Sequence, residues 1–170
     1  MHQCHGRPRQ RCISDSRLEA EINTSTPAAV DAFVRIIKEK KAEDIVDAMS
    51  FDTNQLKRLA ELMPEMPSGL LTSGYANEAN VNKSLRETLK VLQPLNATFN
   101  TSYGGLGKNF MEAAKHRGVI ISPWTFNNKN DFMKFFGLGA FGITTDYASW
   151  AADWAASVKP GKSAYSLSPG

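Results

Sequence analysis

Cysteine is scarce in this chain of 170 residues, and Cys4 and Cys12 are the only two. Both lie in the segment Met1–Arg17, close to His2 and His5. Their spacing fits no standard structural zinc pattern, and one Cys pair without a second pair is weak support for a metal. Two thiols in such a segment indicate a reducing compartment or no redox constraint at all.

Long hydrophobic runs are also missing. The most apolar stretches, such as Gly118–Pro123, have the length of a strand, whereas a membrane helix needs roughly 18–20 apolar residues. Met1–Arg17 lacks the apolar middle section of a secretory signal. We therefore expect no transmembrane segment and no signal peptide, and the compartment stays unknown.

An excess of one charge is the third missing feature. The net charge is +3, and Met1–Arg17 accounts for all of it with four arginines against Asp15. The rest of the chain is balanced, whereas a protein that binds the phosphate backbone needs a concentrated basic face. We predict an atypical basic N-terminal tail over residues 1–17 and no nucleic-acid partner.

What the chain does contain is a regular alternation of strand-like and amphipathic stretches, with enough hydrophobic residues (42%) for one domain core. The predicted strands are Leu18–Ile22, Ile45–Phe51, Gly69–Leu71, Ala97–Tyr103, Gly118–Pro123 and Ala140–Thr144. The predicted helices follow Thr26, Asp52 and Ser84 and then cover Lys108–His116, Asp131–Phe136 and Tyr147–Ala156.

Three helix starts carry capping signals. Thr26 offers a hydroxyl N-cap ahead of Pro27, Asp52 offers a carboxylate, and Ser84 with Glu87 has the form of a capping box. The Gly/Ser/Pro-rich stretch 159–170 is typical of a flexible C-terminal tail.

Strands that alternate with helices at this spacing form βα units, and βα units build parallel sheets. About six such units fit either an open doubly wound sheet or part of a (β/α)8 barrel. No G-x-G-x-x-G loop follows the first strand, which weighs against a dinucleotide-binding sheet. Spacing alone does not decide between the two.

Three segments together resemble the glycerophosphodiester phosphodiesterase family. Leu18–Ile22 is similar to the family's Glu-Ile-Lys strand, and Ser50-Phe51-Asp52 to its Ser-Phe-Asp. Pro123–Asn127 and Gly142–Tyr147 are similar to its Trp-Thr-Val-Asn and Gly-Ile-Ile-Thr-Asp signature. Order and spacing match over most of the chain.

The resemblance implies an α/β fold, namely a partial (β/α)8 TIM barrel of the phospholipase-C-like phosphodiesterase type, over residues 18–158. Family members hydrolyse glycerophosphodiesters with a divalent cation (Ca2+ or Mg2+), which three carboxylates hold, and two histidines transfer the protons. A metal stabilises charge on the phosphoryl oxygens, and an acid protonates the leaving alkoxide.

Individual residues match this pattern in part. By resemblance, Glu21 corresponds to the third metal-binding carboxylate and Trp124 to the aromatic residue beside the glycerol. Asn23 stands where the family has a phosphate-contacting lysine, and an amide cannot replace that charge. We place Asn127, on the loop after that strand, and Phe51, as an apolar wall, with the substrate as well.

The family's opening elements do not occur ahead of Leu18. These are a His-Arg-Gly strand, a Glu-x-Asp metal pair and a catalytic His-Asp. His5-Gly6-Arg7 has similar residue types in another order, and His116 lies at the end of a barrel unit that carries no chemistry. No catalytic residue is therefore identified, and hydrolytic activity is left open.

The leading hypothesis is a truncated, weakly active or inactive glycerophosphodiester phosphodiesterase of lipid metabolism. The alternative is a non-catalytic binding or assembly module that self-associates through the open edges of its partial barrel. An open-sheet protein of unrelated function is a third possibility. Glu19 and Glu21 could also be polar residues of an edge strand, and Trp150 and Trp154 could serve packing alone.

Overall fold

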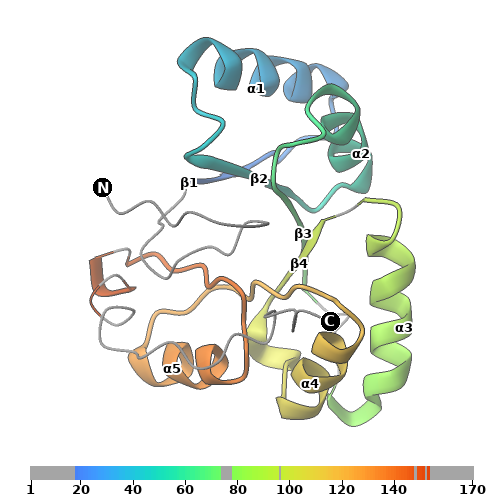
Figure 1. Ribbon diagram of the computed structural model, residues 1–170, viewed down its shortest axis with the longest axis vertical. Coiled ribbons are helices and arrows are strands. Elements are labelled where there is room, and N and C mark those ends of the chain that lie inside the picture. Colours follow the sequence, from blue (N-terminus) through green and yellow to red (C-terminus); the bar gives the residue numbers. More distant parts are fainter. Residues whose placement is uncertain (1–17, 74–77, 96, 148, 152, 154–170) are drawn as a thin grey trace, which may run out of the picture.

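The computed structural model describes residues 18–73, 78–95, 97–147, 149–151 and 153. Strands and helices alternate along this part of the chain (Figure 1). In order they are β1 (Leu18–Glu21), α1 (Pro27–Lys40), β2 (Val46–Ser50), α2 (Thr53–Leu62), β3 (Ser68–Thr72), the 3-10 turn η1 (Glu78–Asn80), α3 (Val81–Leu92), β4 (Thr98–Thr101), the 3-10 turn η2 (Tyr103–Gly105), α4 (Lys108–His116) and α5 (Lys129–Gly137).

The strands form one parallel sheet in the order β1-β2-β3-β4. Two further segments continue it without forming regular strands. Parallel bridges pair Ile121 with Phe99 and Trp124 with Ser102. Beyond them, the Phe141 N–H donates to the Ile121 carbonyl at 2.9 Å, and the Thr144 N–H donates to that of Pro123 at 3.2 Å. Hydrogen bonds thus connect all six predicted strand positions, but the prediction of regular strands over Gly118–Pro123 and Ala140–Thr144 is wrong, because the first has only isolated bridges and the second has single hydrogen bonds.

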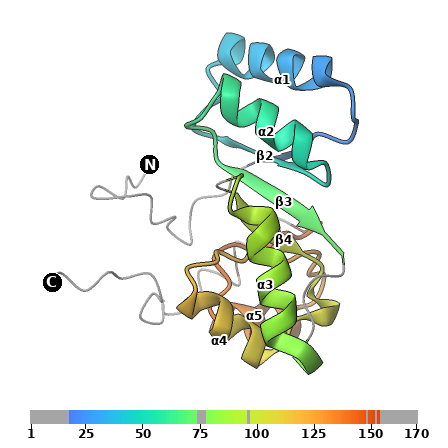
Figure 2. The ribbon, with the colours of Figure 1, turned by 90° about the vertical axis from the view of Figure 1, so that its right-hand side faces the viewer.

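The sheet curves, and the helices lie along its outer side (Figures 1 and 2). This arrangement confirms the predicted α/β fold, a partial (β/α)8 barrel, because each helix connects neighbouring parallel strands on one side of the sheet. In the part of the chain that the structure describes, no helix combines the length and the apolar character needed to cross a membrane.

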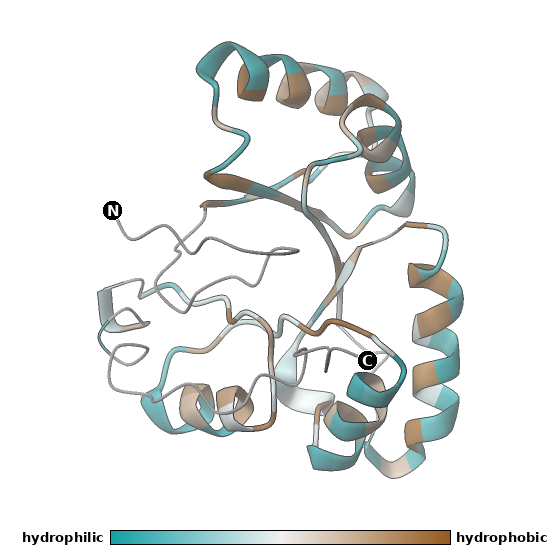
Figure 3. Cartoon of the chain, viewed as in Figure 1, coloured by the Kyte–Doolittle hydropathy of each residue, from teal (hydrophilic) through white to brown (hydrophobic). Residues whose placement is uncertain are grey.

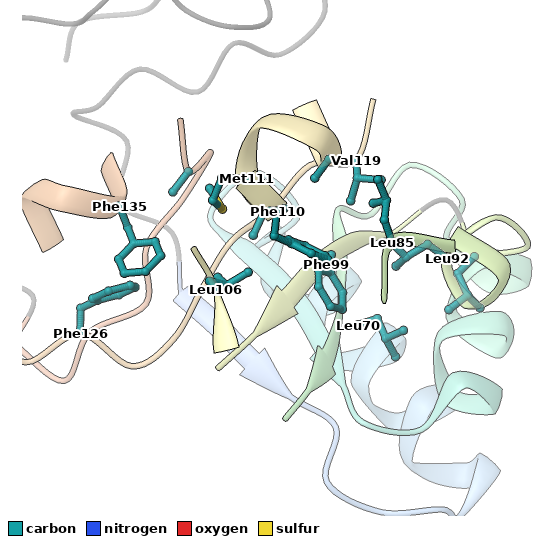
Figure 4. Close-up of a cluster of buried hydrophobic side chains, with 14 of the residues drawn as sticks. Leu70, Leu85, Leu92, Phe99, Leu106, Phe110, Met111, Val119, Phe126 and Phe135 are labelled. Atoms are coloured by element: carbon teal, nitrogen blue, oxygen red, sulfur yellow. The ribbon is translucent and has the colours of Figure 1, made fainter. Parts of the chain in front are cut away.

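The hydrophobic core lies between the sheet and the helices. One cluster joins β1 and β2 to α1 and α2 and includes Val30, Ala48 and Leu59. A larger cluster is centred on Phe99 and Phe110, both fully buried, with α3, α4 and α5 around them (Figure 4). Figure 3 shows the corresponding pattern on α1 and α3, whose hydrophobic residues face the sheet.

Of two predicted helix N-caps, the structure confirms one and shows the other without its side-chain hydrogen bond. The Asp52 carboxylate accepts a 2.8 Å hydrogen bond from the Asn54 N–H at the start of α2, which confirms that cap. Thr26 stands at the N-cap position of α1, but its hydroxyl makes no cap hydrogen bond. The carboxamide of Gln55 on α2 donates instead to the Thr24 and Thr26 carbonyls, so α2 supports the start of α1.

The capping box predicted at Ser84 is wrong. α3 begins at Val81, directly after η1, and Ser84 lies buried inside the helix. The Ser84 carbonyl accepts from the Thr88 hydroxyl at 2.9 Å, as a residue within a helix does. The pattern Ser-x-x-Glu therefore lies in a helix interior, and the helix begins earlier than the predicted start after Ser84.

The C-terminal part of the prediction is only partly described. Ser149–Ala151 and Asp153 are helical, and Trp150 is 45% exposed and stacks on Tyr147 with a centroid distance of 4.0 Å. Trp150 therefore packs on a neighbouring ring and not in the core. The predictions for Trp154 and for the tails 1–17 and 159–170 lie outside the described residues.

Candidate functional site

The face of the sheet turned away from the helices carries the polar residues. Residues paired in parallel register point to the same face, so Glu19 lies beside Asp47, and Glu21 lies in one row with Met49 and Gly69. We call this side the inner face; its residues are Glu19, Glu21, Asp47, Met49, Gly69, Leu71, Thr98, Asn100, Ser122, Trp124 and Thr144.

Two glutamates of β1 lie on the inner face at different depths. Glu21 is exposed at the carboxyl end of the strand. Glu19 is half-buried, and its Oε2 accepts a 2.6 Å hydrogen bond from the Thr144 hydroxyl. The contact joins the first strand to the last segment of the sheet. Both glutamates therefore belong to the inner face, and Glu19 does more there than occupy an exposed edge.

Trp124 is held in place by β4. Its indole N–H donates to the Asn100 carbonyl at 2.8 Å. The Asn100 side chain is buried, accepts at Oδ1 from the Thr98 hydroxyl at 2.7 Å, and lies over Gly69. A Cβ at Gly69 would come within 2.4 Å of the Asn100 Nδ2, so only glycine leaves room for this arrangement. Trp124 is fixed through its ring nitrogen and leaves its ring half-exposed.

Phe51 and Trp124, both predicted to contact substrate, meet at the carboxyl end of the sheet. Their ring centroids are 6.1 Å apart at an interplanar angle of 83°, an edge-to-face contact. Phe51 also lines an open depression of about 410 Å3 at the ends of β1 and β2, together with Asn23. The structure thus brings three predicted residues, Phe51, Trp124 and Asn23, to one end of the strands.

Asn127 stands apart from this group. Its amide Nδ2 donates to the Asp146 carboxylate at 2.8 Å, and its Oδ1 accepts from the Asp146 N–H at 3.3 Å. Asn127 therefore ties the loop after residue 126 to the loop after residue 145. Within the described contacts its amide holds loops together and is not directed at Trp124.

Tyr103 lies beside the site, on the turn that follows β4. Tyr103 stacks on Phe126 at 4.3 Å, and its hydroxyl donates to the Asp131 carboxylate at 3.3 Å. Burial raises the pKa of Tyr103 above 10.0, and the negative charge of Asp131 raises the same pKa further. As a hydrogen-bond donor, the Tyr103 hydroxyl joins the turn after β4 to the first turn of α5.

A metal centre of three carboxylates does not fit the described residues. No group of three or more His, Cys, Asp or Glu among them is arranged to hold a metal ion. His116, the one histidine in the described ranges, is exposed at the C-terminal end of α4, next to the amino end of the following segment.

Sequence reasoning missed several inner-face residues. Asp47 is buried beside Glu19, Asn100 supports Trp124, and Thr144 binds Glu19. The signal that could have found Asp47 and Asn100 is the alternation of polar and apolar residues within their strands, Val46–Ser50 and Thr98–Thr101. Thr144 lies in the Gly142–Tyr147 signature, but its contact with Glu19 had no signal because the two residues are 125 positions apart.

Comparison with known proteins places these observations in a family. Residues 14–149 match the model of the Glycerophosphoryl diester phosphodiesterase family. A curated relative, the glycerophosphodiester phosphodiesterase of Caldanaerobacter subterraneus subsp. tengcongensis, is 28% identical over 120 residues, which is 71% of this chain and 46% of the relative.

Solved structures show the same fold. A glycerophosphodiester phosphodiesterase from Parabacteroides distasonis superposes with a TM-score of 0.62 at 21% identity, covering 83% of this chain and 58% of the other. A putative glycerophosphoryl diester phosphodiesterase from Agrobacterium tumefaciens gives 0.70 at 13% identity, covering 82% and 57%. An Oleispira antarctica phosphodiesterase in complex with the product sn-glycerol-3-phosphate gives 0.63 at 18% identity, covering 77% and 50%. The chain therefore spans about half the length of the relatives it matches.

Proposed function

We propose, from the premise that this chain belongs to the glycerophosphoryl diester phosphodiesterase family, that it carries the substrate-facing part of such an enzyme and lacks hydrolytic activity of its own or retains little. The substrate class would be glycerophosphodiesters, the class in which the product-bound Oleispira phosphodiesterase supplies a precedent. Because the chain spans about half of its relatives, this function is a proposal about the part that is present.

One observation carries the proposal. The Phe51–Trp124 pair lies at the carboxyl end of a partial (β/α)8 barrel, with Glu21 exposed at the same end of β1. In barrels of this type the reactive groups come from the carboxyl ends of the strands. Three residues from three separate parts of the sequence therefore converge where the chemistry of such a barrel takes place.

The weak or absent activity follows from proton transfer. Hydrolysis of a phosphodiester needs a group that protonates the leaving alkoxide, and that group must lie within hydrogen-bond reach of it. His116 is on the far side of its unit, and the inner-face carboxylates have no described metal arrangement with them. Two points stay predictions. One is that the chain binds Ca2+ or Mg2+ with Glu21 as one ligand, and the other is that Asn23 and Asn127 contact the substrate directly.

The direct test is hydrolysis of glycerophosphocholine by the purified chain with Ca2+ or Mg2+ present. We expect no release of glycerol 3-phosphate above the level of the Glu21→Ala variant. Glu87→Ala, an exposed change on α3, is the matched control for loss of one carboxylate. Turnover that Glu87→Ala retains and Glu21→Ala abolishes would show that the chain is a complete enzyme.

A second candidate function is assembly, and one observation favours it. Leu18 and Ile45 are 67% and 62% exposed, and they are joined by a 2.8 Å backbone hydrogen bond at the start of the edge strand β1. Exposed apolar residues on a sheet edge are typical of a surface that pairs with another chain. Light scattering after size exclusion tests this: a defined oligomer that Leu18→Lys dissociates supports the module, and a monomer excludes it.

A further inference from the structure

We propose that the depression at the ends of β1 and β2, together with the Phe51–Trp124 pair, binds a small organic cation of the tetraalkylammonium kind. The proposal concerns binding by this surface alone. It goes beyond the proposed function, because it requires neither a metal ion nor hydrolysis of a diester.

The depression has the size of a small-molecule site. Its volume of about 410 Å3 falls in the usual range of roughly 300–1,000 Å3. The carboxyl ends of two neighbouring strands, the loop ahead of α1 and the start of α2 form its wall, with Ile22 and Asn23 on one side and Phe51 and Asp52 on the other. Apolar and polar groups therefore line it together.

One aromatic ring, that of Phe51, lines the depression, and the Trp124 ring contacts Phe51 beside it. Phe51 is 52% exposed, an unusual degree of exposure for a residue that packs against another ring. Because the Phe51 and Trp124 planes are 83° apart, the two rings form a corner and not a flat stack. Aromatic corners and cages of this kind recognise quaternary ammonium ions, since the negative ring faces attract the cation and the methyl groups cover the apolar surface.

The charges around the depression have one sign. Asp52 lines it, and Glu21 is exposed one residue before Ile22, another lining residue. Of the described residues that line the depression, none carries a positive charge. A cation would be attracted here, whereas a free phosphate would meet carboxylates without a compensating lysine or arginine.

Helix N-termini favour anions, so the starts of α1 and α2 argue for the opposite ligand and have to be weighed. At α2 the Asn54 N–H is already bonded to the Asp52 carboxylate, whose charge offsets the positive end of the helix. At α1, Pro27 has no N–H, and the Thr26 N–H donates to the Thr24 hydroxyl at 3.2 Å. Few donors are left for an anion, and the cation is favoured.

Isothermal titration calorimetry on the whole chain tests the proposal with three probes: tetramethylammonium, tert-butanol as a neutral molecule of similar size, and inorganic phosphate. We expect tetramethylammonium to bind at least about fivefold more tightly than the other two. Its affinity should fall as salt is added, because part of the attraction is between exposed charges.

Two variants separate the rings from the charge. Phe51→Leu keeps an apolar side chain without a ring face, and we expect about a two- to thirtyfold loss of tetramethylammonium affinity. Asp52→Asn keeps a good N-cap for α2 and removes one charge, with a loss of about fivefold. Glu87→Gln, an exposed change on α3, is the control and should leave the affinity unchanged.

Equal binding of tert-butanol, full affinity in Phe51→Leu, or no heat from tetramethylammonium with a chain that is folded by circular dichroism would each overturn the proposal. Tighter binding of phosphate would assign the depression to an anion instead. These outcomes are independent of the hydrolysis test, since a chain without turnover can bind the cation and an active chain can fail to do so.

Discussion

The two faces of the sheet are built from consecutive residues and have opposite chemistry. Leu70, Phe99 and Ile121 point outward and are at most 2% exposed in the core against the helices. Their neighbours Gly69, Asn100 and Ser122 point inward, and there the packing is made of polar groups and a glycine. In each strand, alternate residues thus pack against the helices, and the residues between them line the interior of the partial barrel.

This difference separates stability from function. The outer face is covered by the helices, because every labelled helix from α1 to α5 contributes buried residues. The inner face contains the side chains of Glu19 and Asp47 at paired positions, and two such polar side chains would not be expected together in a hydrophobic core. Changes on the outer face should therefore cost the most folding stability, and changes on the inner face should cost less and also disturb the site.

The largest effect is expected from Phe99→Ala, on the outer face. Phe99 is fully buried between β3, Phe110 and the segment 119–124, so the truncation leaves a cavity. We expect a loss of about 3–5 kcal/mol in the free energy of unfolding, measured by urea titration with circular dichroism.

Its matched control is Thr98→Ala, one residue earlier on the inner face. That change removes hydrogen bonds to the Ser68 carbonyl (3.2 Å) and to Asn100 (2.7 Å), and about 1 kcal/mol should be lost. Equal losses of unfolding free energy at the two positions would contradict the expectation that the outer face contributes more to stability.

The second effect is expected from Gly69→Ala, on the inner face. The added methyl group would overlap the Asn100 side chain, which must move away from the site below Trp124. We expect a loss of about 1–3 kcal/mol and a change in the near-ultraviolet circular dichroism of the aromatic residues. Gly104→Ala meets nothing within 4 Å and should stay within about 0.5 kcal/mol of the parent chain.

The third effect concerns the bond between Glu19 and Thr144. A double-mutant cycle with Glu19→Ala and Thr144→Val should give a coupling energy of about 1 kcal/mol, since the donor and the acceptor are partly buried. Urea titrations of the four chains provide it. Strictly additive losses would mean that the inner face is not joined across its first and last segments.

The smallest effect is the pH dependence due to Tyr103, which lies just beyond β4. Its pKa is raised above 10.0 in the folded chain, first by burial and then by Asp131. The folded state therefore holds the phenolic proton more tightly, and the stability present below about pH 10 is lost as the pH rises through the folded pKa. Urea titrations between about pH 9 and pH 11 should show a shallower decline for Tyr103→Phe; an unchanged decline would refute this assignment.

Local patterns predicted the outer half of the molecule well. α4 covers Lys108–His116 as expected, and Asp52 caps α2, because helix starts and apolar stripes depend on residues within one turn. The capping box predicted at Ser84 was wrong because it also rests on residues within one turn, and a serine followed by a glutamate three residues later also occurs inside a helix. Only η1, which brings the chain into α3 at Val81, distinguishes the two cases.

The candidate site was harder to predict from the sequence. Glu21, Phe51 and Trp124 could be chosen because they match a family pattern, and the structure brings Phe51 and Trp124 into contact. Asn127 matched the same pattern, but its amide is bound to Asp146 on another loop. Whether the Asn127 amide faces the interior depends on loops that meet only in the folded chain, so the local sequence does not predict it.

The hydrogen bond between Glu19 and Thr144 links residues 125 positions apart. Contacts of such long sequence separation form late, because the chain between them must already be ordered. During synthesis β1 emerges 125 residues ahead of Thr144, so this bond can form only after nearly the whole described chain has been made. Until that moment the Glu19 side chain stays in water, and a stalled or cleaved chain would never bury it.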